Sequence, residues 1–303
     1  MKREIRQRKE YLYRLSQKKD KKVLLEEALE GRTKGSNKQI STTDIQYDID
    51  LEQQDDEYAF LEGNRVLLTT SRSPSSTLLQ FVKELSIIFP KAHRINRGNA
   101  TVDEVMVLAK QKQVSDVVIV HETRGVPDTM TISHLPNGPT LRCSLHNVVS
   151  RHQVQQDVRR SNSQDLQEYE WVMKNVPQSD PFVIVNNFNS KIGLRVSTIL
   201  RAIFPETPLD IKFGAKDKRI ITIANEQDIL LFRHHIVKKR QFWKETDENE
   251  KLNKEEYLVL EVGPRFDIKP FELRRGTIDL WKTSDVEWVF RPYQRTAFKK
   301  SIF

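Results

Sequence analysis

Cysteine, long apolar runs and a hydrophobic N-terminal stretch are scarce or missing in this 303-residue chain. A single cysteine, Cys143, can form neither an internal disulfide nor a paired-cysteine metal site, which fits a reducing compartment. The longest apolar run is Val105–Ala109, whereas a membrane helix needs about 20 residues, so we expect no transmembrane span. Charges fill the first ten residues, where a signal peptide would place its apolar stretch, and secretion is therefore not expected.

Signatures of catalysis are also missing, since the chain has no Walker-type phosphate loop, GxGxxG fingerprint, GxSxG elbow or HExxH motif. The pair His121-Glu122 follows a predicted strand, but without a second histidine at helical spacing it is a weak hydrolytic signal. His234 and His235 are adjacent on another predicted strand, so their side chains face opposite ways and cannot bind one metal ion. Cys143 alternates with leucines, which predicts a core residue rather than a nucleophile. We therefore expect a protein that is not an enzyme and needs no metal or cofactor.

Charge, in contrast, is abundant and unevenly distributed: 50 Lys+Arg stand against 42 Asp+Glu, and the mean hydropathy is −0.60. Residues 1–40 hold 13 basic and 6 acidic residues, 41–63 hold eight acids and no Lys or Arg, and 64–303 hold 37 bases and 28 acids. This pattern predicts a basic arm, an acidic connector and a basic body. The pI of 9.4 favours an acidic polymer as partner without identifying it.

The arm, residues 1–40, is predicted to be helical because the stretch 3–30 has no Gly or Pro. Its apolar residues Ile5, Leu12 and Leu15 form only a narrow stripe. Two interpretations stay open: a solvated helix, or an arm that becomes ordered on RNA or on a partner protein.

The body is predicted to be mixed α/β and to repeat itself. A buried strand at 65–70 and another at 181–185 are each followed by a polar turn and an amphipathic helix, and both helices end in Ile-Phe-Pro, at Phe89 and Phe204. This predicts two duplicated halves, 64–150 and 181–303, joined by a polar helical linker at 151–180. We also predict a helix at 103–111 and strands at 116–121, 130–132, 141–145, 219–223, 229–237, 256–262 and 286–291.

Basic clusters recur at the turns of both halves. Ser71-Arg72-Ser73 follows the first strand, where small hydroxyl groups and a guanidinium could hold a phosphate at a helix N-terminus. The stretch 238–244 mixes cations with aromatics, which suits contact with a nucleic-acid backbone and stacking on bases. Each cluster alone could be a solvated surface, but their recurrence favours RNA binding. The candidate RNA-binding residues are Arg72, Lys91, Arg94, Arg97, Arg233, Lys238, Lys239, Arg240, Arg265, Arg291 and Arg295.

An ordered series of motifs resembles the Brix domain family over about residues 60–300. The series comprises LTTSRSPSS at 68–76, Phe89-Pro90 with RINRG at 94–98, HETRG at 121–125, SHLPNGPT at 133–140, FRHH at 232–235 and GPRF at 263–266. The EYLYR stretch at 10–14, DVEW at 285–288, RPY at 291–293 and Thr296-Ala297 resemble the subtype found in the U-three small nucleolar ribonucleoprotein.

The resemblance implies a Brix domain of two anticodon-binding-like α/β halves without enzymatic activity. It implies binding of the U-three snoRNA and pre-rRNA in the nucleolar small-subunit processome, beside an Mpp-ten scaffold subunit and a small ribosomal-protein-like subunit. The expected role is to stabilise snoRNA–pre-rRNA duplexes during 18S rRNA maturation. Two alternatives stay open: a large-subunit Brix-type assembly factor, and a protein-only scaffold that uses 41–63 as its interface.

Overall fold

A computed structural model of the chain describes residues 64–89, 91–160, 166–174, 176–177, 179–205, 218–242 and 254–290. The predicted arm and connector (1–63) and the C-terminal tail (291–303) lie outside the described residues. No helix in the described part is long and apolar enough to cross a bilayer.

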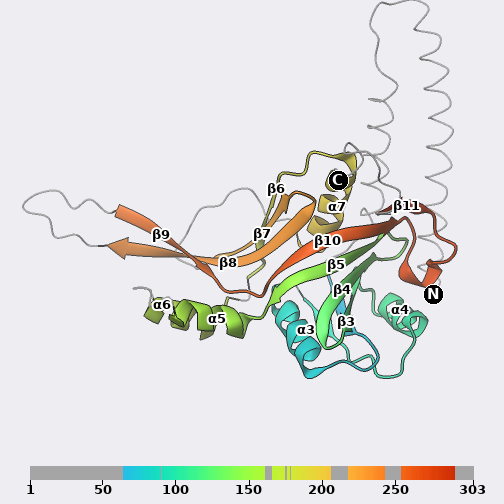
Figure 1. The fold of residues 1–303 in the computed structure, drawn as a ribbon, viewed down its shortest axis with the longest axis horizontal. Coiled ribbons are helices and arrows are strands. Elements are labelled where there is room, and N and C mark those ends of the chain that lie inside the picture. Colours follow the sequence, from blue (N-terminus) through green and yellow to red (C-terminus); the bar gives the residue numbers. More distant parts are fainter. Residues whose placement is uncertain are drawn as a thin grey trace, which may run out of the picture.

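One mixed sheet of eleven strands organises the described residues, in the order β2-β1-β3-β4-β5-β10-β8-β7-β6, with β9 paired to β8 and β11 to β10 (Figure 1). The first half contributes β1 (Val66–Thr70), α3 (Ser76–Ile88), β2 (His93–Arg94), α4 (Val102–Gln111), β3 (Asp116–Thr123), β4 (Val126–His134) and β5 (Thr140–Val149). Two helices follow, α5 (Arg151–Arg160) and α6 (Leu166–Lys174). The second half contributes β6 (Phe182–Asn186), α7 (Lys191–Ala202), β7 (Lys218–Glu226), β8 (Ile229–Phe242), β9 (Lys254–Glu261), β10 (Arg265–Arg274), the 3-10 helix η1 (Ile278–Leu280) and β11 (Val286–Val289).

The same sequence of strand pairings occurs in both halves. In the first half β1 pairs with β3 in parallel, and β4 and β5 then follow antiparallel. In the second half β6 pairs with β7 in parallel, and β8 and β10 then follow antiparallel. The antiparallel pair β5–β10 joins the halves at the middle of the sheet. The predicted strands and helices are confirmed at these places, but β10 was not predicted at all.

The largest core lies between the sheet and the helices α3 and α7, and both halves contribute to it. Phe89 and Phe204, the residues of the two Ile-Phe-Pro repeats, pack on each other there with ring centroids 5.6 Å apart. Cys143 is fully buried in this core, which confirms its prediction as a core residue. Because the two helices meet at their C-terminal ends, one hydrophobic cluster serves both halves.

Two smaller clusters complete the packing. Helix α4 covers the opposite face of β1 and β3 through Val105, Met106 and Ala109. Its N-terminus carries a capping box, in which Thr101 and Glu104 each accept a hydrogen bond from the other's backbone N–H. Helices α5 and α6 lie beside the long β8–β9 extension (Figure 1) and bury Tyr169 and neighbouring residues against it.

A buried arginine ties the second half to the end of α3. Arg219 of β7 donates to the carbonyl oxygens of Ile87 at 2.7 Å and Ile88 at 3.3 Å, and to Ser179 O at 3.2 Å. Its Nε donates to His234 Nε2 at 3.4 Å, while His234 Nδ1 lies 2.9 Å from Gly263 O. The guanidinium thus caps carbonyls at the C-terminus of α3, where a positive charge is favoured.

Candidate nucleic-acid interface

The strand β1 is a topological switch point, because the two strands that follow it in the chain, β2 and β3, pair with it on opposite sides. From β1 the chain runs through α3 to β2, and from β2 it runs through α4 to β3 on the other side of β1. Helices α3 and α4 cover opposite faces of the sheet. In open α/β sheets, ligands bind in the crevice outside the carboxyl ends of the strands at such a point.

Two of the predicted RNA-binding arginines lie at this switch point. Arg72 follows β1 and is exposed. Arg97 follows β2, is half-buried, and donates from Nε to Ala100 O at 2.9 Å, which fixes the side chain against its own loop. Because β1 and β2 run parallel, the loops that follow them lie at one edge of the sheet. Burial and then the charge of Arg72 lower the pKa of Arg97.

His121 of β3 and Arg142 of β5 extend this positive region across the sheet. Burial lowers the pKa of His121, and the charges of Arg97 and Arg142 lower it further. Arg142 is only partly neutralised, since its Nη1 lies 3.5 Å from Glu272 Oε2. We call Arg72, Arg97, His121 and Arg142 the switch-point cluster.

Buried hydroxyl groups accompany the cluster on the same sheet face. Thr69 and Thr131 both pair in register with Ile119, and Arg142 pairs with Thr131. Since side chains alternate along a strand, His121 lies on the face of Ile119. The hydroxyls of Thr69 and Thr131, and Nε of Arg142, have no hydrogen-bond partner among the described residues. These polar groups are buried, so they lie next to the positive charge of the cluster without being exposed themselves.

The N-terminus of α3, in contrast, already has its negative partner. Ser75 caps the helix by accepting from Leu78 N at 3.2 Å. Glu122 accepts from Ser75 N at 2.7 Å and from the Ser75 hydroxyl. A carboxylate thus occupies the place where the sequence predicted a phosphate, so an anion here would rely on the switch-point cluster rather than on the helix terminus.

The switch-point cluster gathers basic side chains at the carboxyl edge of the sheet. The neighbouring carboxylate of Glu122 accepts two hydrogen bonds from Ser75. Among the described residues, no three His, Cys, Asp or Glu side chains could hold a metal ion together. A cluster of basic side chains of this kind can bind the phosphates of a polyanion.

Comparison with known proteins agrees with the series of motifs. Residues 71–272 match the family model of the Brix domain. The chain belongs to the Brix domain family. It is 38% identical to the U3 small nucleolar ribonucleoprotein protein imp4 of Schizosaccharomyces pombe, with 97% of each chain covered. The IMP4 proteins of Saccharomyces cerevisiae and Homo sapiens are each 36% identical to it, with 99% of this chain and 99% and 98% of theirs covered.

Among solved structures, a probable ribosomal biogenesis protein from Aeropyrum pernix K1 is similar to this Brix domain. The match has a TM-score of 0.45 and 19% identity, and it covers 68% of this chain and 96% of that chain.

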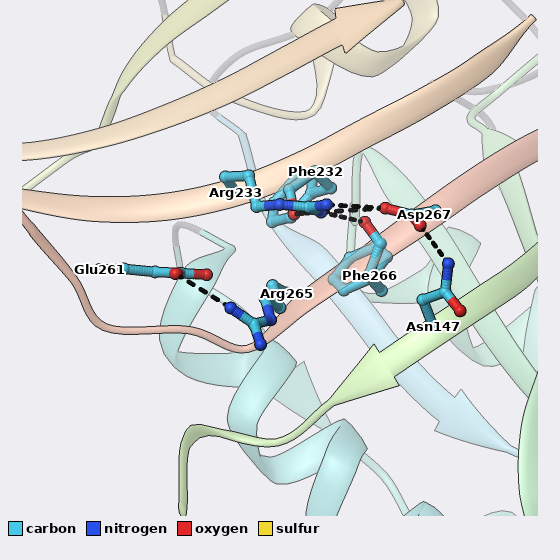
Figure 2. A network of polar contacts seen from close by, with 7 residues as sticks. All are labelled: Asn147, Phe232, Arg233, Glu261, Arg265, Phe266 and Asp267. Atoms are coloured by element: carbon cyan, nitrogen blue, oxygen red, sulfur yellow. Dashed lines mark hydrogen bonds and ion pairs between the residues drawn. The ribbon is translucent and has the colours of Figure 1, made fainter. Parts of the chain in front are cut away.

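In the second half of the Brix domain, Arg233 is engaged within the sheet (Figure 2). Its Nη1 and Nη2 both donate to Asp267 Oδ1 at 3.0 Å, and Nη1 also donates to the Phe232 and Phe266 carbonyl oxygens. Asn147 of β5 donates to Asp267 Oδ2 at 2.7 Å. The network joins β8, β10 and β5 where the halves meet, so Arg233 has a structural role there.

The other predicted basic residues are dispersed over the molecule. Arg265 pairs with Glu261 at 3.3 Å and Asp157 at 3.6 Å, and Lys238 Nζ lies 4.7 Å from the ring centroid of Trp171. Lys91 precedes β2 and Arg94 belongs to it; both are exposed, and Arg94 lines a groove on α3. The side chains of Lys239 and Arg240, and the whole of Arg291 and Arg295, lie outside the described residues.

Sequence reasoning missed Arg142 and treated His121 only as a weak catalytic candidate. Both residues join the cluster through strand pairing, because β4 places β5 beside β3. The signal for Arg142 was the alternation Leu141-Arg142-Cys143-Ser144, in which polar residues share the face opposite the core.

Proposed function

We propose that this chain is a non-catalytic RNA-binding component of a U3 small nucleolar ribonucleoprotein and acts in ribosome biogenesis in the nucleolus. Relatives with that printed name share 35–38% identity with it over nearly their whole length. The observation that supports the RNA contact is the switch-point cluster. Arg72 and Arg97 follow the parallel neighbours β1 and β2, and His121 and Arg142 lie on β3 and β5 of the same sheet.

The cluster would grip the phosphates of RNA rather than read its bases. Guanidinium groups bind phosphates in bidentate geometry, and the deep major groove of A-form RNA hinders side chains from reading base edges. A nearby phosphate would also favour protonation of His121, whose pKa is lowered by burial and by its neighbouring arginines in the free protein. Binding of this kind depends on backbone shape and charge more than on sequence.

The resulting mechanism is stabilisation of short duplexes between the U3 snoRNA and pre-rRNA, which prepares the precursor for 18S rRNA maturation by other factors. Neutralising phosphates at the crevice favours the paired state, because a duplex brings more phosphates within reach than separated strands do. The protein partners under this proposal are an Mpp-ten scaffold subunit and a small ribosomal-protein-like subunit. The two halves, with their matching strand pairings, would be duplicated anticodon-binding-like units.

Crosslinking in cells, followed by sequencing of the bound RNA, tests this function. We expect crosslinks on the U3 snoRNA and on the pre-rRNA segments that pair with it. Crosslinks mainly on large-subunit precursors would indicate a large-subunit Brix-type factor instead. A complete lack of RNA crosslinks, with normal expression, would leave a protein-only scaffold and contradict the proposal.

A further inference from the structure

A second surface, distinct from the switch-point cluster, lies on the outer side of α3. It is a groove of about 650 Å³ between α3, β2, α5 and α6. The lining includes the cations Lys83, Arg94 and Lys174, with Arg94 supplied by β2. Its apolar side chains are Leu79, Ile87 and Met173, and Ile87 is 39% exposed.

The single carboxylate in the lining is already occupied by the protein itself. Glu84 accepts from the backbone N of Arg151 at 2.9 Å, at the first residue of α5, and from Gln80 Nε2 at 3.4 Å. It thus serves as a negative group at the N-terminus of α5. The groove therefore carries more positive than negative charge.

A buried donor in the wall points to an anionic ligand. Arg151 donates from Nη2 to Met173 O at 3.3 Å, but its buried Nε has no partner among the described residues. Burial lowers the pKa of this guanidinium. An incoming carboxylate or phosphate would satisfy the unpaired donor and offset the desolvation of the charge.

The rest of the lining favours a protein segment over RNA. No Phe, Tyr or Trp side chain is among the described residues that line the groove. Its one aromatic ring is the imidazole of His152, which is hydrogen-bonded to Gln156 at 2.9 Å, so bases would find little stacking surface there. Leu79, Ile87 and Met173 instead offer apolar contacts for aliphatic side chains. Gln155 adds an amide that can both donate to and accept from a peptide backbone, whereas phosphates only accept.

We propose that this groove is a docking site for an acidic protein segment that carries aliphatic anchor residues. The anchors contact Leu79, Ile87 and Met173, while carboxylates of the segment pair with Lys83 and Lys174 at the edges. The inference goes beyond the proposed RNA contact and does not depend on it, because the switch-point cluster uses other residues.

Selection of peptides on the immobilised full-length chain tests this assignment. The probe is a phage-displayed library of random 16-residue peptides, sequenced after selection and remeasured as synthetic peptides by fluorescence anisotropy. The test variant is Lys83→Glu with Lys174→Glu, both exposed in the wild type. The matched control is Lys112→Glu with Lys282→Glu, which changes two exposed lysines outside the groove by the same charge.

We expect enriched peptides to be acidic with spaced aliphatic residues, to lose at least tenfold in affinity with the groove variant, and to bind the control variant normally. Failure to enrich acidic peptides, or equal affinity for both variants, would overturn the proposal. Two further outcomes would also overturn it. One is a loss of RNA-duplex affinity in the groove variant as large as that caused by Arg72→Ala with Arg97→Ala. The other is competition by a synthetic peptide of residues 41–63 as strong as that of the selected peptides, which would assign the groove to the chain itself.

Discussion

Replacing Arg219 by methionine removes the guanidinium that joins the two halves while keeping most of the side chain's apolar length. Arg219 is 5% exposed and donates to three backbone carbonyls and to His234. Two of those carbonyls, of Ile87 and Ile88, lie in the last turn of α3, where helical carbonyls have no partner within the helix. The variant therefore leaves several polar groups unsatisfied at once.

The expected magnitude follows from those contacts. A hydrogen bond to a charged group contributes about 1.5–3 kcal/mol, and a buried acceptor left unpaired costs about 1–3 kcal/mol. The 2.7 Å bond to Ile87 O is short, whereas the 3.3 Å and 3.4 Å contacts are weaker. Removing the buried charge recovers part of its desolvation penalty. We expect a net loss of about 3–5 kcal/mol in the free energy of unfolding.

Urea unfolding followed by tryptophan fluorescence and circular dichroism measures this loss. Arg124→Met is the matched control, because Arg124 is exposed in the β3–β4 turn. Arg219→Lys should lie between the wild type and Arg219→Met, since one ammonium cannot reach all four acceptors. A change below about 1 kcal/mol for Arg219→Met, with an unaltered denaturant slope, would refute the capping role.

Two other predictions concern stability. Burial lowers the pKa of His234 to about 4, whereas this histidine titrates near 6.5 in the unfolded state. The folded state therefore keeps His234 neutral, and roughly 3 kcal/mol of folding stability should be present above pH 6.5 and lost as the pH falls to 4. Unfolding measured at a series of pH values should show this loss in the wild type but not in His234→Gln. The same pH dependence in both proteins would contradict the prediction. Phe89→Ala and Phe204→Ala should each lower the free energy of unfolding by about 3–5 kcal/mol. Because the two rings touch, a double-mutant cycle should show about 0.5–1.5 kcal/mol of coupling between them. Strict additivity of the two losses would argue against the shared core.

The periodic elements could be predicted from sequence because their burial follows a simple pattern. The apolar run at 66–68 and the spaced apolar residues of α3 predict a buried strand and an amphipathic helix, and both exist. The Ile-Phe-Pro repeat follows two helices, α3 and α7, as the sequence predicted, but the contact between Phe89 and Phe204 could not be seen in the sequence. That contact depends on how the sheet brings the two helix ends together.

Strand β10 was not predicted because a proline in its middle divides its sequence into two short alternating stretches. Polar and apolar residues alternate from Arg265 to Lys269, but Pro270 lacks an N–H for the ladder and the alternation changes phase at Phe271. The structure accommodates the proline at a register shift between Pro270 and Glu272, opposite β5. Polar residues of the strand find partners across the sheet, as Asp267 does with Arg233. Its identity as a strand thus depends on neighbours that are remote in sequence.

The candidate site was predictable only in part, because it too depends on residues that are remote in sequence. Arg72 and Arg97 follow strands directly, so the topology of parallel strands places them at one edge. Arg142 reaches the same place only across β4, and Arg233 is drawn away by Asp267. Sequence alone shows neither the strand order nor which carboxylate neutralises which arginine.

The most direct test of RNA binding at the switch point is a titration of a short snoRNA–pre-rRNA duplex at several salt concentrations. The full-length chain carrying Arg72→Ala and Arg97→Ala is compared with Arg160→Ala and Arg201→Ala, two exposed arginines on α5 and α7 whose removal causes the same change in charge. Each phosphate contact contributes about 0.7–0.9 to the slope of log affinity against log salt. We predict that the switch-point variant binds weakly across many duplex sequences, with a slope shallower by up to about two contacts, while the control variant matches the wild type. Equal affinity and equal slope for the switch-point variant and the wild type would contradict RNA binding at this crevice.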